Sequence, residues 1–431
     1  RNDHSSVLPE NNNSFFYPAL SGSFVFTDLI GSNDIFTAGK FRASYAEIGS
    51  ALTPQRLNDI YTSNGLIDAN GGAARKYSVP GRKNNPNLKE ERTKSYELGA
   101  EVSFLDGRLG FDMSYYNRVS SDQILSVTVS RATGYSSKVL NVGTIENNGL
   151  ELMLFAKPIK TDDFSWDMSV NFTRNRNQVT KLAEGLDNLV LGSFQGGVTL
   201  NATLGQPYGS IRGTDYVYND NGERTVLSNG RYATTNSNQT IGDANPDWLA
   251  GISNRVRYKN LALSFLIDIR KGGDVFSLDM YYGMATGLYP ETVGLNDLGN
   301  PLRNPISEGG GVILPGVKAD GSPNDVRYNT QNYGGFGYVA NPNKAFVYDA
   351  GYVKLREVAI TYSLPSTLIE KIKIAKAIDV SITGRNLWII SKNLPYADPE
   401  GNLGAGNLSS GYSGGAYPMT RNVGFNLKFK F

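Results

Sequence analysis

Few side chains in this sequence could perform catalysis or bind a metal. The 431-residue chain contains one histidine, His4, and no cysteine. A histidine-based catalytic or zinc centre is therefore not expected, and disulfide frameworks and thiolate metal sites are excluded. The 42 Lys and Arg nearly balance the 40 Asp and Glu, for a formal net charge of +2. This balance gives no support to a nucleic-acid partner.

Two loop-like motifs resemble ligand sites only superficially. YNDNGERTVLSNG, residues 218–230, has the Asp, Asn and Gly content of a calcium loop, but only Asp220 and Glu223 are acidic. An EF-hand needs acidic ligands at alternate positions and a closing Glu, so a turn-rich hairpin is expected instead. RKGGDVF, residues 270–276, lacks the G-K-[ST] of a phosphate loop, and no helix is expected after it. It is interpreted as the end of a strand.

The elements that must position any site are strands. The chain has 25 Tyr, 19 Phe and 48 Gly, and only 19% charged residues, a composition that favours β structure. Apolar and polar residues alternate with a period of two in about eleven segments, most of them longer than the usual strand of about five or six residues. The segments are 14–26, 40–48, 93–104, 108–118, 149–157, 164–173, 248–258, 260–272, 352–363, 378–390 and 421–431.

The connections between these segments are alternately short and long. Short links, such as the Asp-Gly turn at 104–108, alternate with long links at 49–92, 120–148, 182–247, 276–351 and 391–420. A soluble sandwich has no reason to alternate in this way. An outer-membrane β-barrel has short periplasmic turns and long external loops. No run of about 18 apolar residues, which a membrane helix would need, is present.

The two faces of the predicted strands differ in chemistry. The only tryptophans, Trp166, Trp248 and Trp388, all fall on the apolar face and toward strand ends, as an aromatic girdle at the membrane interfaces requires. Burying the charges of the other face in a sandwich core would be costly, whereas a wet barrel lumen accommodates them. A membrane barrel is favoured, and a soluble β-sandwich or solenoid is the alternative. The charges are Glu97, Glu101, Asp112, Arg118, Asp167, Arg255, Arg257, Asp268 and Arg270.

Several stretches resemble the barrel of SusC/RagA-type TonB-dependent transporters of the Bacteroidota. They are NPNLKEERTKSYELGAEVSFLDGRLGFDMSYYNR, VLNVGTIENNGLEL, IGDANPDWLAGISNRVRYKNLALSFLIDIRKGGDVFS, YVKLREVAITYSLP and GRNLWIISKNLPYADPEGN. The resemblance implies that residues 1–431 are the C-terminal part of an all-β, antiparallel transmembrane barrel of about 22 strands. An odd strand count and a first strand running inward also favour missing upstream strands, because such barrels have even strand numbers. By resemblance, a plug domain precedes the barrel.

The same resemblance implies function and partners. Family members lie in the outer membrane, pair with a SusD-like surface lipoprotein, and import glycans or oligopeptides with energy from TonB. No catalytic residue, metal or cofactor is then expected, and the chain is not an enzyme. A passive porin or an adhesin barrel without energy coupling is the alternative.

Two groups of aromatic residues are candidate functional sites. The loop 276–351 carries aromatic side chains that could contact ligand or lipoprotein, or could simply pack the loop: Tyr281, Tyr282, Tyr289, Tyr333, Phe336 and Tyr338. The final strand, RNVGFNLKFKF, alternates up to a terminal aromatic. Phe425, Phe429 and Phe431 resemble the signal by which the barrel-assembly machinery recognises its clients, with the apolar face toward outer-membrane lipid.

Overall fold

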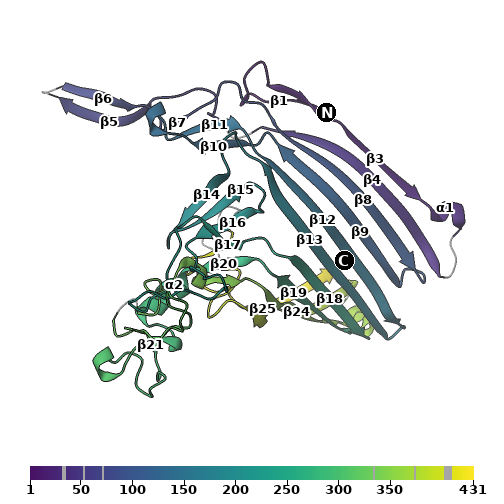
Figure 1. Ribbon diagram of the computed structural model, residues 1–431. Coiled ribbons are helices and arrows are strands. Elements are labelled where there is room, and N and C mark those ends of the chain that lie inside the picture. Colours follow the sequence, from purple (N-terminus) through teal and green to yellow (C-terminus); the bar gives the residue numbers. More distant parts are fainter. Residues whose placement is uncertain (32–34, 52–53, 70–71, 333–334, 373–374, 402–409) are drawn as a thin grey trace.

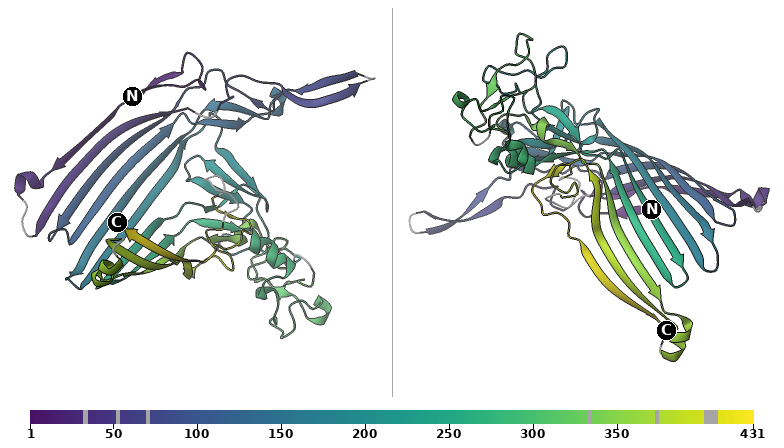
Figure 2. Two further views of the ribbon diagram at one scale, coloured as in Figure 1. Left: turned by 180° about the vertical axis from the view of Figure 1, so that it is seen from behind. Right: turned by 90° about the horizontal axis from the view of Figure 1, so that it is seen from below.

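One antiparallel sheet of eleven strands dominates the molecule. The computed structural model describes residues 1–431 except 32–34, 52–53, 70–71, 333–334, 373–374 and 402–409. Strands that follow one another along the chain lie side by side, and the sheet curves across its width (Figures 1 and 2). Its strands are β3 (Ala19–Val25), β4 (Phe36–Ser50), β8 (Glu91–Phe104), β9 (Leu109–Ser121), β12 (Thr144–Lys160), β13 (Phe164–Lys181), β18 (Trp248–Tyr258), β19 (Leu261–Lys271), β24 (Tyr352–Ser363), β25 (Ala377–Lys392) and β27 (Asn422–Lys430).

All eleven predicted segments are strands of this sheet, so the expected architecture is confirmed. The first segment is interrupted, because β2 (Ser14–Phe16) pairs with β1 (Asn2–His4) and only β3 joins the large sheet. The sheet ends at β3 on one side and β27 on the other.

The two ends of the sheet differ in the length of the connections between strands. At one end the chain turns tightly, for example through Asp106 and Gly107, whose φ angles are 54° and 74°. Aspartate and glycine tolerate this left-handed region better than other residues. The other short connections include α1 (Thr27–Ile30) and α3 (Ser366–Ile372). The long connections all lie at the opposite end, here called the loop end (Figure 2).

The sheet has one apolar face and one polar face. Across neighbouring strands, directly opposed residues share a face. One such row is Phe41, Ala100, Met113, Leu152, Phe172, Ala250 and Ile269. The row beside it points to the other side and includes Lys40, Glu101, Asp112, Asn171, Asp268 and Lys354.

None of the residues that the structure describes covers the apolar face. Phe41 is 52% exposed and Met113 41% exposed, although both belong to a wholly apolar row. A contiguous exposed apolar surface of this kind marks contact with lipid or with other protein. A hydrocarbon environment fits a band that runs across consecutive strands of a barrel-type sheet.

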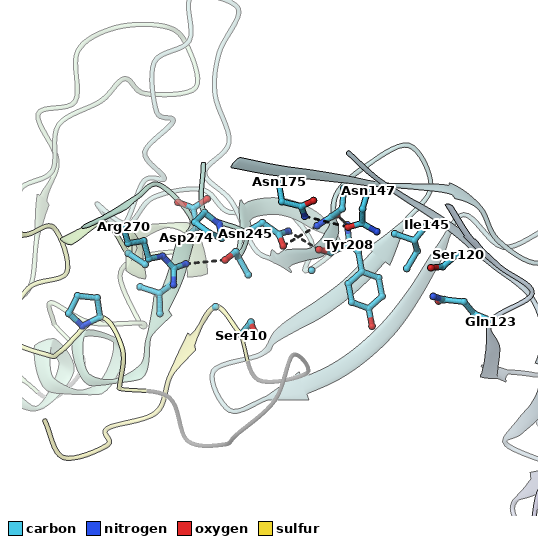
Figure 3. A pocket seen from close by; sticks show the side chains of 18 residues that line it. Ser120, Gln123, Ile145, Asn147, Asn175, Tyr208, Asn245, Arg270, Asp274 and Ser410 are labelled. Carbon is cyan, nitrogen blue, oxygen red and sulfur yellow. Dashed lines mark hydrogen bonds between the residues drawn. The ribbon is translucent and has the colours of Figure 1, made fainter. Parts of the chain in front are cut away.

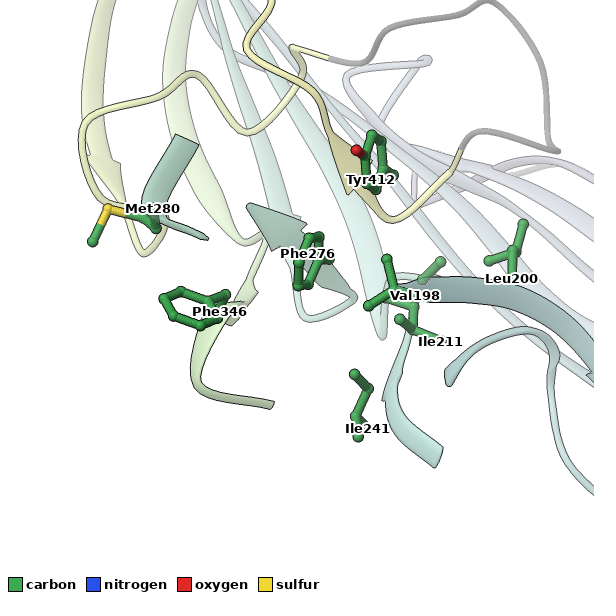
Figure 4. Close-up of a cluster of buried hydrophobic side chains, with 9 residues drawn as sticks. Val198, Leu200, Ile211, Ile241, Phe276, Met280, Phe346 and Tyr412 are labelled. Carbon is green, nitrogen blue, oxygen red and sulfur yellow. The ribbon is translucent and has the colours of Figure 1, made fainter. Parts of the chain in front are cut away.

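Segments of several long connections fold together into a loop domain at the loop end (Figure 1). Its core lies between a four-stranded sheet and helix α2 (Leu278–Thr286), and Figure 4 shows Phe276 and Tyr412 within it. The expectation that no helix follows RKGGDVF is wrong, because α2 begins directly after this motif. Ser277 caps it by accepting a hydrogen bond from the backbone N of Met280 at 3.2 Å, the usual role of an N-cap serine. The domain contains β14 (Asn188–Phe194), β15 (Val198–Thr203), β16 (Tyr208–Gly213), β17 (Gln239–Asp243), β20 (Asp274–Ser277), β23 (Val347–Asp349) and β26 (Tyr412–Ser413).

The remaining elements are short or project from the loop end. The two-stranded hairpin of β5 and β6 extends away from the sheet (Figures 1 and 2). Residues 218–230 form the expected turns, with a hydrogen bond from the backbone N of Asn219 to the carbonyl of Glu223 at 2.9 Å. These elements are β5 (Thr62–Ala69), β6 (Gly72–Ser78), β7 (Arg82–Lys83), β10 (Ile124–Thr128), β11 (Ser137–Asn141), β21 (Val312–Ile313), β22 (Arg327–Tyr328) and the 3-10 helices at Arg131–Thr133, Pro290–Thr292, Ile306–Glu308 and Asn343–Phe346.

Candidate functional site

A polar cavity of about 530 Å³ lies at the loop end, between the polar face of the sheet and the loop domain (Figure 3). The strands β12 and β13 contribute Asn147, Asn175 and Asn177, all on polar-face positions. The loop domain contributes Tyr208 and Asn245 from the opposite side. The cavity therefore has a wall of strands on one side and folded loops on the other.

Amide side chains fasten the loop domain to the strands around this cavity. The Asn177 amide donates to Asn245 Oδ1 at 3.1 Å, and its oxygen accepts from the backbone N of Tyr208 at 2.6 Å. Asn245 in turn donates to the Tyr208 carbonyl at 2.8 Å. Because asparagine both donates and accepts, the remaining capacity of such a lining suits an uncharged, hydrogen-bonding ligand.

One carboxyl on the cavity wall is shielded from solvent. Asp274, at the start of β20, accepts a hydrogen bond from the backbone N of Asp243 at 2.8 Å. Burial raises the pKa of Asp274 above the usual value for an aspartate, because a charged carboxylate loses solvation there. Arg270, at the end of β19, reaches the Ala244 carbonyl at 3.1 Å (Figure 3). The charges around the cavity are thus engaged within the protein.

A second polar centre joins strand β24 to the loop after β25. The Lys354 ammonium lies 2.6 Å from Asp398 Oδ1 and 2.5 Å from Glu400 Oε2. Arg356 forms two hydrogen bonds to Glu400, at 2.8 and 2.9 Å, and also contacts Asp268 of β19. The side chains of Lys354 and Asp398 are each only 5% exposed.

Glu400 is ionised throughout the physiological range. Partial burial would raise its pKa, but hydrogen bonds from Arg356 and Lys354 outweigh this effect and lower the pKa of Glu400 to about 2. These contacts did not emerge from the sequence. The available signal was the alternation of Lys354 and Arg356 in YVKLREV and the two acids in YADPEG, but nothing in the sequence indicates that the two segments meet.

The predicted charged residues all lie on the polar face. Asp167 is directly opposite Arg255. Arg42, which the sequence did not single out, lies 2.6 Å from Asp112 and 3.4 Å from Glu101. This face therefore carries paired, partly solvated charges, as a wet lumen would.

Three of the predicted loop aromatics, Tyr281, Tyr289 and Tyr338, pack against the core of the loop domain. Tyr281 stacks on Tyr338 with ring centroids 4.7 Å apart, and Tyr282 meets Tyr281 edge-on at 5.0 Å. Tyr289 stacks on Tyr396 at 4.3 Å. Tyr333 lies outside the described residues. Phe336 lies beneath the Arg303 guanidinium at 5.5 Å. None of the described members of this group lines the 530 Å³ cavity, so their contact with a ligand or partner stays a prediction.

The three tryptophans lie on the apolar face at different levels. Trp166 is near the short-turn end, and its Nε1 donates to Asn254 Oδ1 at 3.1 Å. Trp248 begins β18 at the loop end and packs 5.8 Å from Phe172. Trp388 is 58% exposed and pairs with Leu355, whose other neighbour is Ile267. Trp388 is therefore farther from the loop end than Trp248, and a girdle formed by all three stays a prediction.

The terminal aromatics share one face of the last strand. Phe425 pairs with Ile382 and Phe429 with Ile378 of β25. The rings of Phe429 and Phe431 lie 6.5 Å apart with nearly parallel planes. Their arrangement fits lipid contact, and recognition by the assembly machinery stays a prediction.

None of the helices in the described part of the chain combines the length and apolar character of a membrane-spanning helix. Within the same residues, no group of three or more His, Cys, Asp or Glu side chains is arranged to hold a metal ion.

A meander of long strands with one apolar face, one charged face and folded loops at one end defines the β-barrel class of outer-membrane protein. The family model described as TonB dependent receptor-like, beta-barrel matches residues 1–265. The chain belongs to this family, which confirms the resemblance found in the sequence.

Individual relatives agree with this membership. TonB-dependent receptor P26 of Formosa agariphila is 28% identical over 469 residues, which cover 100% of this chain and 44% of the relative. TonB-dependent receptor SusC of Bacteroides thetaiotaomicron is 27% identical over 366 residues, covering 80% of this chain and 32% of the relative. The chain thus spans less than half the length of these curated relatives.

A solved structure shares the fold. The structure of the RagAB peptide transporter superposes with a TM-score of 0.72 at 20% sequence identity, covering 99% of this chain and 44% of the matched chain. At this identity, the likeness concerns the arrangement of strands and loops.

Proposed function

We propose that this chain forms part of the barrel wall and the external loops of an energised outer-membrane importer of the SusC type. The observation that carries the proposal is the sheet itself. Its rows of apolar side chains face one way, its paired charges face the other, and its folded loops gather at one end. Family membership and the similarity to SusC support the same conclusion.

The division of the two faces suggests how each part contributes. The apolar face contacts outer-membrane lipid, and the polar face lines the route of the substrate. The amide-lined cavity at the loop end lies where a substrate would enter from outside. Transport makes and breaks no covalent bond, so the wall acts by hydrogen bonding, shape and charge.

Partners and energy supply follow the family pattern in this proposal. A SusD-like lipoprotein closes over the external loops, and TonB supplies energy through a plug domain. The barrel-assembly machinery inserts the protein with Phe425, Phe429 and Phe431 as part of its signal. One matched structure is described as a peptide transporter, and the family resemblance implies glycans or oligopeptides as cargo. We propose an oligomeric solute of one of these two classes.

Membrane insertion is tested by fractionating cells that express the full-length protein. The protein should remain in the outer membrane after washing with high salt and with alkaline carbonate, and should require detergent for release. Release by salt alone would support a soluble β-protein and overturn the proposal.

Energy coupling is tested separately, because a passive porin or an adhesin would also fractionate with the membrane. Uptake of labelled oligosaccharides and oligopeptides should depend on both the protein and TonB. Uptake that persists at the same rate without TonB would indicate a passive pore. A plug domain encoded upstream and a SusD-like gene beside it would support the importer.

A further inference from the structure

One side of the amide-lined cavity is formed by a segment that belongs to no strand of the large sheet. Pro399 lines the cavity together with Ala350 and Val275. It lies in the segment Leu394–Gly401, here called the strap, which follows β25. The backbone hydrogen bonds from Ala397 to Pro395 and from Gly401 to Asp398 stay inside the strap. Contact with the rest of the protein therefore depends on side chains.

Ion pairs hold the strap on both sides of Pro399. Asp398 precedes this proline and pairs with Lys354 at 2.6 Å, while Glu400 follows it and pairs with Lys354 at 2.5 Å. Arg356 donates hydrogen bonds to Glu400 from two guanidinium nitrogens. This geometry fixes the orientation of the two side chains as well as the distance between them. Tyr352 adds a hydrogen bond from its hydroxyl to Glu400 at 3.0 Å.

Further contacts attach the rest of the strap, among them a hydrogen bond from Lys392 Nζ to the Ala397 carbonyl at 2.5 Å. Leu394 is 1% exposed and packs against Val275 and Ala350, which line the cavity. Tyr396 stacks on Tyr289 and donates to Glu291 at 2.8 Å. Tyr396 has a φ of 56°, a conformation that costs a bulky residue free energy and persists only where surrounding contacts impose it.

We propose that Lys354 and Arg356 are positioning residues that set access to the cavity, because they hold the strap, and with it Pro399 and Leu394, against the cavity wall. The role of the cavity in import rests on the proposed function. The attachment of the strap does not, and it can be measured without any transported solute.

The choice of variant follows from the charges. Asp268, Asp398 and Glu400 face Lys354 and Arg356, and each of these two bases has two acidic partners. Lys392 and Arg270 lie near Asp398 and Glu400 respectively. Glu400→Gln removes one carboxylate and leaves no base without an acidic partner. Lys354→Ala, by contrast, would leave the buried Asp398 without its cation, which is strongly destabilising.

The test measures labelling of a single cysteine, because this chain contains none. Ala350→Cys places the thiol beneath Leu394, and a small methanethiosulfonate reagent is added to the purified full-length protein. Glu400→Gln should raise the labelling rate several-fold. The matched control is Glu357→Gln on β24, the strand that carries Lys354 and Arg356. It breaks the exposed pair of Glu357 with Arg385 of β25 at 3.0 Å and should leave the rate unchanged.

A second, more conservative variant keeps the test valid if Glu400→Gln fails to fold. Arg356→Lys keeps the positive charge but loses the paired hydrogen bonds to Glu400. It should therefore raise the labelling rate by less than Glu400→Gln does. Equal rates in the parent, Glu400→Gln and Arg356→Lys would overturn the proposal. Equal acceleration by Glu357→Gln would also overturn it, because the effect would then be general to β24. Neither result depends on whether the protein transports anything.

Discussion

At the scale of single residues, Asn254 is an unusual member of the apolar face. It lies between Met168 and Phe265 across neighbouring strands, and its side-chain oxygen accepts a hydrogen bond from the Trp166 indole at 3.1 Å. The asparagine is only 8% exposed. The Trp166 indole supplies the hydrogen-bond donor that its side-chain oxygen needs in this buried position. A polar group without a partner at this depth would be costly.

This pair gives a stability prediction. Trp166→Phe should lower the free energy of unfolding by about 1–3 kcal/mol, because it leaves the Asn254 oxygen unsatisfied. Urea unfolding of the full-length protein in micelles measures the change. The double variant Trp166→Phe with Asn254→Leu should recover part of the loss, since removing both polar partners is nearly neutral. A double variant less stable than the single one would contradict this account.

Glu400 gives a pH prediction at the same scale. Its pKa falls from an ordinary value of 4.5 to about 2 on folding, so its contribution to stability is complete above pH 4.5 and is lost as pH falls toward 2. The groups that contact it are Lys354, Arg356 and Tyr352, with Asp398 beside it, Asp268 across Arg356, and Arg270 nearby. The urea midpoint of the Glu400→Gln variant should be lower than that of the parent protein by the same amount at pH 7 and at pH 5. The difference between the two midpoints should be smaller at pH 3. A difference that grows on acidification would reverse the sign and refute the assignment.

At the scale of elements, the strands could be predicted and the loops could not. Segments with period-two alternation, such as 164–173, can be recognised as strands from the sequence alone, because each strand must present one face to lipid and the other to water. Their neighbours follow from chain order, since short turns pair consecutive strands. Helix α2 and the core around Phe276 have no such periodicity. Their partners, among them Tyr412 and Val198, come from distant links, and only the folded chain brings them together.

The faces of the strands can be tested directly. Cysteines at Glu97 and Glu101 should react quickly with a charged thiol reagent supplied from water, whereas cysteines at Leu98 and Val102 should react slowly. The first pair lies on the polar face and the second on the apolar face of β8. Labelling in intact outer membranes distinguishes them. The opposite pattern would mean that the register is shifted by one residue, because such a shift turns every side chain over.

At the scale of the whole molecule, the final strand offers a test of assembly. Deleting Phe431 should lower the amount of protein in the outer membrane, while each inserted molecule should transport at the parental rate. Surface levels measured by immunoblot of outer-membrane fractions, and uptake normalised to them, separate the two effects. Phe431→Tyr, which keeps an aromatic ring, is the matched control. Unchanged surface levels after the deletion would remove the terminal aromatic from the assembly signal.

The loop domain has a consequence for the order of events during biogenesis. In its three-stranded sheet, β20 pairs with β23 and also, in parallel, with β26, joining Phe276 to Tyr412. Segments so far apart in sequence pair slowly unless other contacts first bring the ends of the intervening chain together. Once β19, β24 and β25 have paired, the ends of these links are already held at one rim. We therefore expect the external loops to fold last, after the strands have crossed the membrane, so a loop mutation would delay maturation without delaying insertion.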